Sequence, residues 1–156
     1  MNAVTGIGPR TGTSWVMGKL KDAGLQVNGH KFIPDLLVPQ HNPLGYWELD
    51  PREPTPTTGI SKLWRIWDKG NIDKVVVLER LDVQAQLQSI EKVFQDELKL
   101  EAYKSLLQRT PKDILLEYVE GMNNWLNNRD PKKTMLVYTE NLNNEISKII
   151  NFFKEE

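Results

Sequence analysis

The chain has 156 residues, and its 20 lysines and arginines nearly balance 21 aspartates and glutamates, which leaves a formal net charge of −1. This balance excludes a bulk electrostatic attraction to nucleic acid or to a membrane surface, so we expect neither as a partner. The sequence contains no cysteine, which excludes a disulfide framework, a thiolate metal site and a cysteine nucleophile. The length fits a single domain over residues 1–156. No apolar run approaches membrane-spanning length and a strand is expected almost from the first residue, so the expected location is the cytoplasm.

The first 25 residues are predicted to form a strand, a turn and a helix. Apolar residues within 3–7 predict a short strand, apolar residues recur at helical spacing over 16–20, and Gly24 is a helix stop. The turn between them, residues 8–14, carries glycines, hydroxyl side chains and one arginine. Such a turn points backbone N–H groups and the positive end of a helix at one spot. The turn is therefore predicted to bind a phosphate or a group of similar shape and charge.

The next part of the chain is predicted to be mostly loop, because residues 34–59 contain six prolines. A weak apolar run at 31–33 indicates a short second strand. Residues 61–69 are predicted to form a short helix. Its tryptophans, Trp64 and Trp67, are interpreted as packing against another helix, with a partner surface or the lining of an acceptor pocket as the alternatives. Residues 74–78 form the clearest strand, a continuous apolar run of the kind that is buried in a parallel sheet.

The remaining predicted elements are a helix from Asp82 to about residue 108, a helix from Thr110 to Asn127, a strand over 134–138 and a helix from Asn141 onward. The start of the second helix, residues 110–113, is well marked by a capping hydroxyl, a proline and an acid in the first turn. Strands that alternate with helices predict a three-layer α/β/α fold with a short parallel sheet. Ligands bind beyond the carboxyl ends of such strands, so the loops 8–14 and 79–82 are expected to face one cleft.

The loop at residues 9–15 resembles a known family. Its sequence, P-R-T-G-T-S-W, is similar to the 5′-phosphosulfate loop of sulfotransferases, P-K-S-G-T-T-W, with conservative changes at three positions. The ATP-type phosphate loop, G-x-x-x-x-G-K-[ST], is not present. Residues 42–48 resemble the family's N-P-x-G-Y-[FW]-E segment, residues 74–89 its 3′-phosphate segment, and residues 135–142 with the closing helix its C-terminal strand and helix. The resemblance implies a P-loop NTPase-like topology, with residues 34–73 as a long loop on the acceptor side.

The resemblance also implies a function and a set of binding residues. The implied function is metal-independent transfer of a sulfuryl group from 3′-phosphoadenylyl sulfate (PAPS) to a hydroxyl or amine of a small molecule or glycan. Arg10 would neutralise charge on the bridging oxygen, and Arg80 with Ser89 would hold the 3′-phosphate, with Gln88 as an alternative to Ser89. The remaining predicted cofactor-binding residues are Thr11, Gly12, Thr13 and Ser14 at the 5′-phosphate and Trp15 against the adenine.

A hydroxyl acceptor also needs a base near the sulfur. Glu48, which ends the family-like G-Y-W-E segment, is the first candidate, and His41 in the same predicted loop is the second because histidine titrates near neutral pH. The alternative for both is an ordinary loop residue. With only two histidines and no cysteine in the chain, a dedicated metal site is not expected.

Two alternatives to the transferase remain open. The first is a P-loop nucleotide kinase or NTPase, in which Glu79 at the end of an apolar strand would organise magnesium. The second is a non-catalytic, nucleotide-binding descendant of the sulfotransferase fold. It is suggested by two departures from the family: a C-terminal R-K-G-x-x-G-type loop is missing, and Ser89 follows Arg80 one residue later than is usual.

Overall fold

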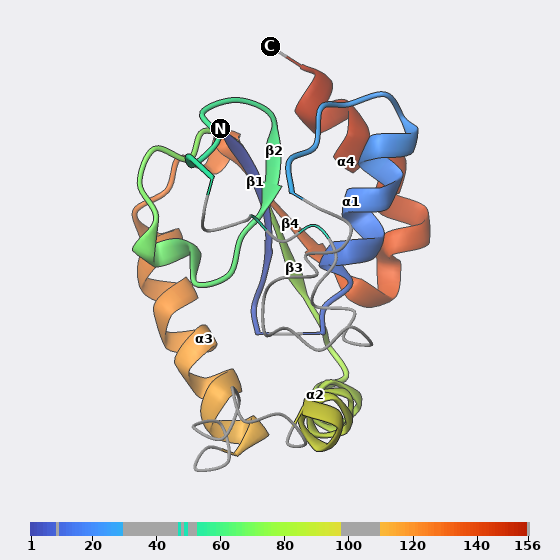
Figure 1. The fold of residues 1–156 in the computed structure, drawn as a ribbon, viewed down its shortest axis with the longest axis vertical. Coiled ribbons are helices and arrows are strands. Elements are labelled where there is room, and N and C mark those ends of the chain that lie inside the picture. Colours follow the sequence, from blue (N-terminus) through green and yellow to red (C-terminus); the bar gives the residue numbers. More distant parts are fainter. Residues whose placement is uncertain (9, 30–46, 48, 50–52, 98–109, 156) are drawn as a thin grey trace.

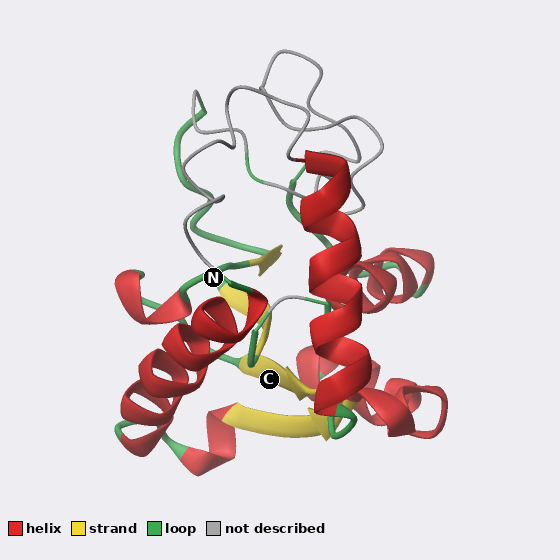
Figure 2. Cartoon of the chain, turned by 90° about the horizontal axis from the view of Figure 1, so that it is seen from below, coloured by secondary structure: helices red, strands yellow, loops and turns green. Residues whose placement is uncertain are grey.

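The computed structural model describes residues 1–8, 10–29, 47, 49, 53–97 and 110–155. It shows a parallel four-stranded sheet with helices on both faces (Figures 1 and 2), which confirms the α/β class. The strand order is β2-β1-β3-β4, and β1 lies between β2 and β3. The strands are β1 (Asn2–Gly6), β2 (Ile60–Lys62), β3 (Val75–Glu79) and β4 (Thr134–Tyr138). The helices are α1 (Thr13–Asp22), α2 (Val83–Glu97), α3 (Pro111–Asn127) and α4 (Leu142–Lys154), with 3₁₀ turns η2 (Ile66–Asp68), η4 (Pro131–Lys133) and η5 (Thr139–Asn141).

The sheet separates two hydrophobic clusters because alternate residues of each strand point to opposite faces. On one face, Val4 of β1 and Val76 of β3 pack with apolar residues of α1 and α4. On the other face, Ala3 and Val75 pack with Met122 of α3 and with residues around η2. Val75 to Leu78 are all fully buried, as expected for a central parallel strand. Both faces of β1 and β3 are therefore covered, which holds the carboxyl ends of these strands in fixed positions.

Helix ends follow the signals in the sequence. Thr110 caps α3 through a capping box, in which its hydroxyl accepts from the Asp113 N–H and the Asp113 side chain accepts from the Thr110 N–H. The Asp82 carboxylate accepts a hydrogen bond from the Ala85 N–H at 3.0 Å and so caps α2. Gly24 follows α1 with a left-handed φ of 85°. The predicted starts of these helices and the predicted strands at 74–78 and 134–138 are confirmed to within a residue or two.

The prediction of a short helix over 61–69 is wrong. Residues 60–62 form β2, which pairs in parallel with β1 and is completely buried, and only residues 66–68 make a 3₁₀ turn. The sequence I-S-K has no strand periodicity, so its pairing with β1 depends on tertiary contacts rather than on local preference. Trp67 faces inward and packs on α3, at the position of Gly121 and edge-on to Tyr118 with ring centroids 5.3 Å apart. Helix packing is thus the correct interpretation of Trp67.

Some predictions fall outside the described residues. These include the strand at 31–33 and much of the predicted loop at 34–59. They also include the part after Glu97 of the helix that was predicted to run from Asp82 to about residue 108. Within the described part of the chain, no helix combines the length and the apolar character needed to cross a membrane.

Candidate functional site

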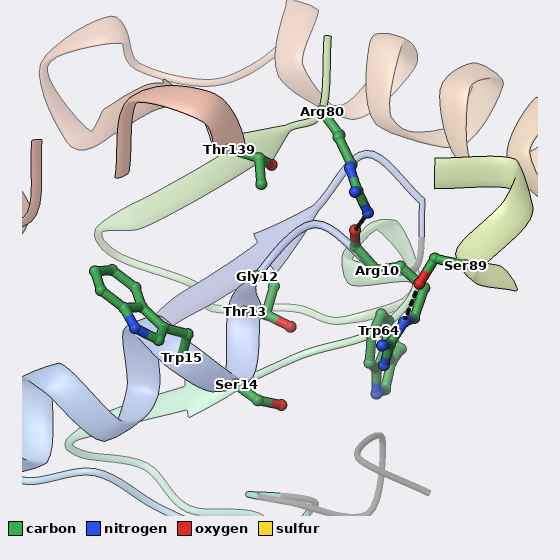
Figure 3. A pocket seen from close by; sticks show the side chains of 9 residues that line it. All are labelled: Arg10, Gly12, Thr13, Ser14, Trp15, Trp64, Arg80, Ser89 and Thr139. Atoms are coloured by element: carbon green, nitrogen blue, oxygen red, sulfur yellow. Dashed lines mark hydrogen bonds between the residues drawn. The ribbon is translucent and has the colours of Figure 1, made fainter. Parts of the chain in front are cut away.

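A pocket of about 360 Å³ lies at the carboxyl ends of β1 and β3 (Figure 3). Two of its described lining residues are arginines and none is acidic. The expectation that the loop after β1 and the segment after β3 face one cleft is therefore confirmed. The pocket is lined by Arg10, Gly12, Thr13, Ser14, Trp15, Trp64, Arg80, Ser89 and Thr139.

Glycines let the loop after β1 turn tightly into α1. A β-carbon on Gly6 would lie 2.1 Å from the Thr11 hydroxyl oxygen, so only glycine allows the loop to fold back this closely. Gly12, the N-cap residue of α1, has a φ of 97°, and its carbonyl accepts the first helical hydrogen bond from the Val16 N–H at 3.1 Å. A glycine cap has no side chain to occupy the helix start. The start of α1 therefore faces the pocket without a capping side chain in front of it.

Arg10 and Arg80 meet at the rim of the pocket (Figure 3). Arg10 has a left-handed backbone with φ 65°, which is unusual for a residue other than glycine. Its carbonyl accepts a 3.2 Å hydrogen bond from the Arg80 guanidinium, and its own Nε donates to the Ser89 hydroxyl at 2.8 Å. These hydrogen bonds join the loop after β1, the residue that follows β3, and α2 at one place. Both arginines line the pocket, so an anion bound there would lie near two positively charged side chains.

Thr139 belongs to the site, although the sequence analysis did not select it. It begins η5 after β4, and its hydroxyl donates to the Thr11 carbonyl at 2.7 Å. This bond connects the loop after β1 to the segment that follows β4. A threonine directly after a predicted strand is a weak signal, and its contact with the loop follows from the parallel order of β1, β3 and β4.

Lys62 is the second residue that sequence reasoning missed. It ends β2, is only 2% exposed, and donates a 3.3 Å hydrogen bond from Nζ to the Ser14 hydroxyl. Its ammonium group also lies 5.2 Å from the ring centroid of Trp64. The loop sequence lacks the lysine of an ATP-type phosphate loop, but a neighbouring strand places a lysine beside the same loop. No local signal could have shown this, because residues 60–62 do not read as a strand.

Most of the predicted binding residues come together in the pocket. Arg10, Gly12, Thr13, Ser14, Trp15, Arg80 and Ser89 all line it. Ser89 lines the pocket although it follows Arg80 one residue later than is usual in sulfotransferases. Gln88, the alternative to Ser89, is exposed and is not among the lining residues.

Three predicted site residues do not join this set. The Thr11 side chain is fully buried behind the loop, close to Gly6, and its hydroxyl has no hydrogen-bond partner among the described residues. The structure therefore does not bring the Thr11 side chain into the pocket. The two candidate bases, Glu48 and His41, lie outside the described residues.

No known protein family, curated protein or solved structure matches the chain. Its function is therefore inferred from the chemistry of the pocket.

Three charged groups with shifted pKa values lie outside the pocket lining. The hydrogen bond from Lys133 lowers the pKa of Asp73, and the same contact raises the pKa of Lys133, with 2.7 Å between the two side chains. Burial lowers the pKa of Arg129, which donates to the carbonyls of Ile72, Asp73 and Lys133. None of these three side chains lines the pocket, and their contacts tie the segment before β3 to the segment before β4. Their role is structural.

Proposed function

We propose that the pocket binds an adenosine nucleotide phosphorylated at its 3′ and 5′ positions, and that the protein transfers a sulfuryl group from PAPS to a hydroxyl or amine acceptor. The observation that supports nucleotide binding is that Arg10, Arg80 and Ser89 line one pocket with the start of α1. The choice of PAPS and of sulfuryl transfer rests on the resemblance of residues 9–15 to the sulfotransferase loop. Two phosphates need two separate sets of donors. The chain supplies one set from the loop after β1 and one from the end of β3 with α2.

The residues present fit such a ligand. A volume of about 360 Å³ lies within the range of about 300–1,000 Å³ that is typical of small-molecule sites. The start of α1, with the hydroxyls of Thr13 and Ser14, suits a 5′-phosphate. Arg80 and Ser89 suit a 3′-phosphate, since a planar guanidinium can donate two parallel hydrogen bonds to it. Trp15, on the pocket wall and 39% exposed, offers an aromatic face to a base.

The chemistry asked of the protein is positioning and charge stabilisation. The acceptor oxygen or nitrogen forms a bond to sulfur while the bond from sulfur to the bridging oxygen breaks. The electron pair of that bond leaves with 3′-phosphoadenosine 5′-phosphate, and the acceptor proton passes to a base. Arg10 would stabilise the charge that collects on the bridging oxygen, and Lys62 adds positive charge behind Ser14. Glu48, or else His41, remains the predicted base.

The kinase or NTPase alternative receives less support from the pocket. It depended on Glu79 as the acid that organises magnesium, but Glu79 is exposed at the end of β3 and is not among the described lining residues. The non-catalytic alternative shares the same nucleotide site and differs only in turnover.

A thermal-shift titration tests the ligand class. We expect 3′-phosphoadenosine 5′-phosphate without metal to raise the melting temperature more than 5′-AMP or ATP with magnesium does, because binding to the native state stabilises it. Ligand at about one hundred times Kd should add about 2.7 kcal/mol to the free energy of unfolding. A larger shift with magnesium–ATP would contradict the proposal and favour the kinase alternative.

A matched pair of variants tests the assignment of the 3′-phosphate. Arg80→Gln should remove the preference for 3′-phosphoadenosine 5′-phosphate over 5′-AMP, whereas Arg65→Gln, which changes an exposed arginine outside the pocket, should keep it. Transfer itself is tested by incubating the protein with sulfur-labelled PAPS and a mixture of hydroxyl and amine acceptors. Binding without transfer would support the non-catalytic alternative.

A further inference from the structure

The edge strand β4 has an exposed apolar face. In register, Leu136 lies beside Val77 of β3, and both side chains point to the face that α3 covers. Val77 is fully buried, but Leu136 is 66% exposed, because the cover by α3 does not reach the edge strand. Tyr138, on the same face, is 45% exposed. Leu81 is 57% exposed and lies at the same end of β4, since its N–H donates to Glu140.

The two edges of the sheet are treated differently. Beside β2, the segment around Val27 forms a parallel bridge to Ile60, and the N–H and carbonyl of Ile60 both bond to this segment. Beside β4, no further strand follows among the described residues, and Figure 2 shows this strand at the lower margin of the molecule. β4 itself, T-M-L-V-Y, contains no charge and no proline. Exposed edge strands normally carry such residues to prevent pairing with another chain.

We propose that β4 pairs with β4 of a second copy of this chain, antiparallel and centred on Leu136. In this register Leu136 lies opposite itself, and Thr134 lies opposite Tyr138 of the partner copy. The exposed apolar side chains of the two copies then cover one another. The pairing joins two four-stranded sheets through their open edges and leaves the pocket residues of each copy in place.

The charges at the two ends of β4 favour a second copy of this chain as the partner of the β4 edge. Lys132 precedes the strand and Glu140 follows it, both exposed. Lys132 lies in η4 and Glu140 in η5, so an antiparallel pair centred on Leu136 brings the end of β4 that carries Lys132 near the end that carries Glu140 in the other copy, twice per dimer. The two ends of the edge therefore carry opposite charges, which an antiparallel second copy brings together. A parallel arrangement would place like charges together instead.

The size of the contact predicts a weak dimer. A standard protein interface buries about 800 Å² on each partner, and pairing of a five-residue strand buries less. We therefore expect association at micromolar or higher concentration. Sedimentation velocity of the full chain, from low to high micromolar concentration, should show a monomer that converts to a dimer.

Two exposed leucines provide matched variants. Leu136→Lys should abolish the dimer, while Leu116→Lys, on α3 and 51% exposed, should leave the dimer unchanged. Circular dichroism melting of both variants separates loss of the dimer from loss of the fold. A wild-type protein that is monomeric at every concentration overturns the proposal, and the edge would then fit a strand of a different protein. A dimer that survives Leu136→Lys also overturns it.

The absence of native cysteine allows a direct test of the register. Opposed residues of an antiparallel pair lie at a distance that a disulfide can span. Leu136→Cys should therefore form an intermolecular disulfide with oxidised glutathione, and Leu116→Cys should form none or form it much more slowly. Equal rates for the two variants overturn the register. This inference is independent of the nucleotide, because the dimer is expected with or without it.

Discussion

Lys62 is the residue whose role depends most on its surroundings. Burial of an ammonium group is costly unless polar partners compensate for the lost water. Here the Ser14 hydroxyl and the face of Trp64 supply such contacts, and Ser14 lies in the loop that faces the pocket. A charge retained at this cost next to the loop that lines the pocket is the basis for the hypothesis that Lys62 takes part in the proposed binding.

Replacing Lys62 with methionine tests that role. Lys62→Met keeps the side-chain length but removes the charge, so we expect the Kd for 3′-phosphoadenosine 5′-phosphate to rise by about tenfold to a hundredfold, the equivalent of a charge-assisted hydrogen bond. The Kd is measured by thermal shift, each variant against its own melting temperature without ligand. Lys92→Met, at an exposed position on α2, is the control and should bind like the wild type. Equal Kd values for the two variants would show that Lys62 has only a structural role.

At the scale of the element, two glycines have opposite effects on α1, one at its N-cap and one within it. Gly12 caps the helix with φ 97°, and a β-carbon there would lie 2.9 Å from Cδ1 of Leu142. Gly18 lies within the helix, and a β-carbon there would meet no atom within 4 Å. The first glycine is required by the backbone and by α4, whereas the second only makes the helix less stable than alanine would.

Alanine substitutions should therefore have opposite effects. Gly18→Ala should stabilise the protein by about 0.5–1 kcal/mol, and Gly12→Ala should destabilise it by at least about 1 kcal/mol because of the left-handed backbone. Urea denaturation measures both values. Gly12→Ala should also weaken nucleotide binding, since it displaces the start of α1. Stabilisation by Gly12→Ala would mean that this turn is not built as described.

At the scale of the whole molecule, a single sheet connects two hydrophobic clusters. β1 contributes Val4 to the cluster with α1 and α4, and Ala3 to the cluster with α3. The two clusters lie on opposite faces of the same strands. Loss of packing in one cluster would therefore remove the support of the strands on which the other cluster packs. We therefore expect the two faces to unfold together.

Two buried methionines, one on each face, test this expectation. Met17 of α1 and Met122 of α3 are both fully buried, and each change to alanine should cost about 2–5 kcal/mol. In both variants, unfolding followed by circular dichroism and by tryptophan fluorescence should give coincident single transitions, shifted by similar amounts. A biphasic transition in either variant would show that the two faces unfold independently.

The sequence by itself determined the elements whose signals are local. The buried run at 75–78, the capping box at Thr110 and the glycine-bounded loop before α1 could be predicted because each depends on neighbouring residues. The same is true of Arg10, Gly12, Thr13 and Ser14 as pocket residues, because they belong to one loop, whereas the Thr11 side chain was wrongly expected there. Arg80 and Ser89 were predicted from a family resemblance. In the structure both line the same pocket as the loop after β1.

Only the tertiary structure decided the rest. The strand β2 forms because β1 offers it an edge, and that pairing places Lys62 beside Ser14. Thr139 reaches the loop because β4 lies parallel to β3, and Leu136 is exposed because β4 ends the sheet. These contacts join residues that are distant in the sequence, where neither periodicity nor turn chemistry carries information. Parallel strands always meet their partners through long connections, so their order in the sheet, and the side chains which that order brings together, depend on packing rather than on local sequence.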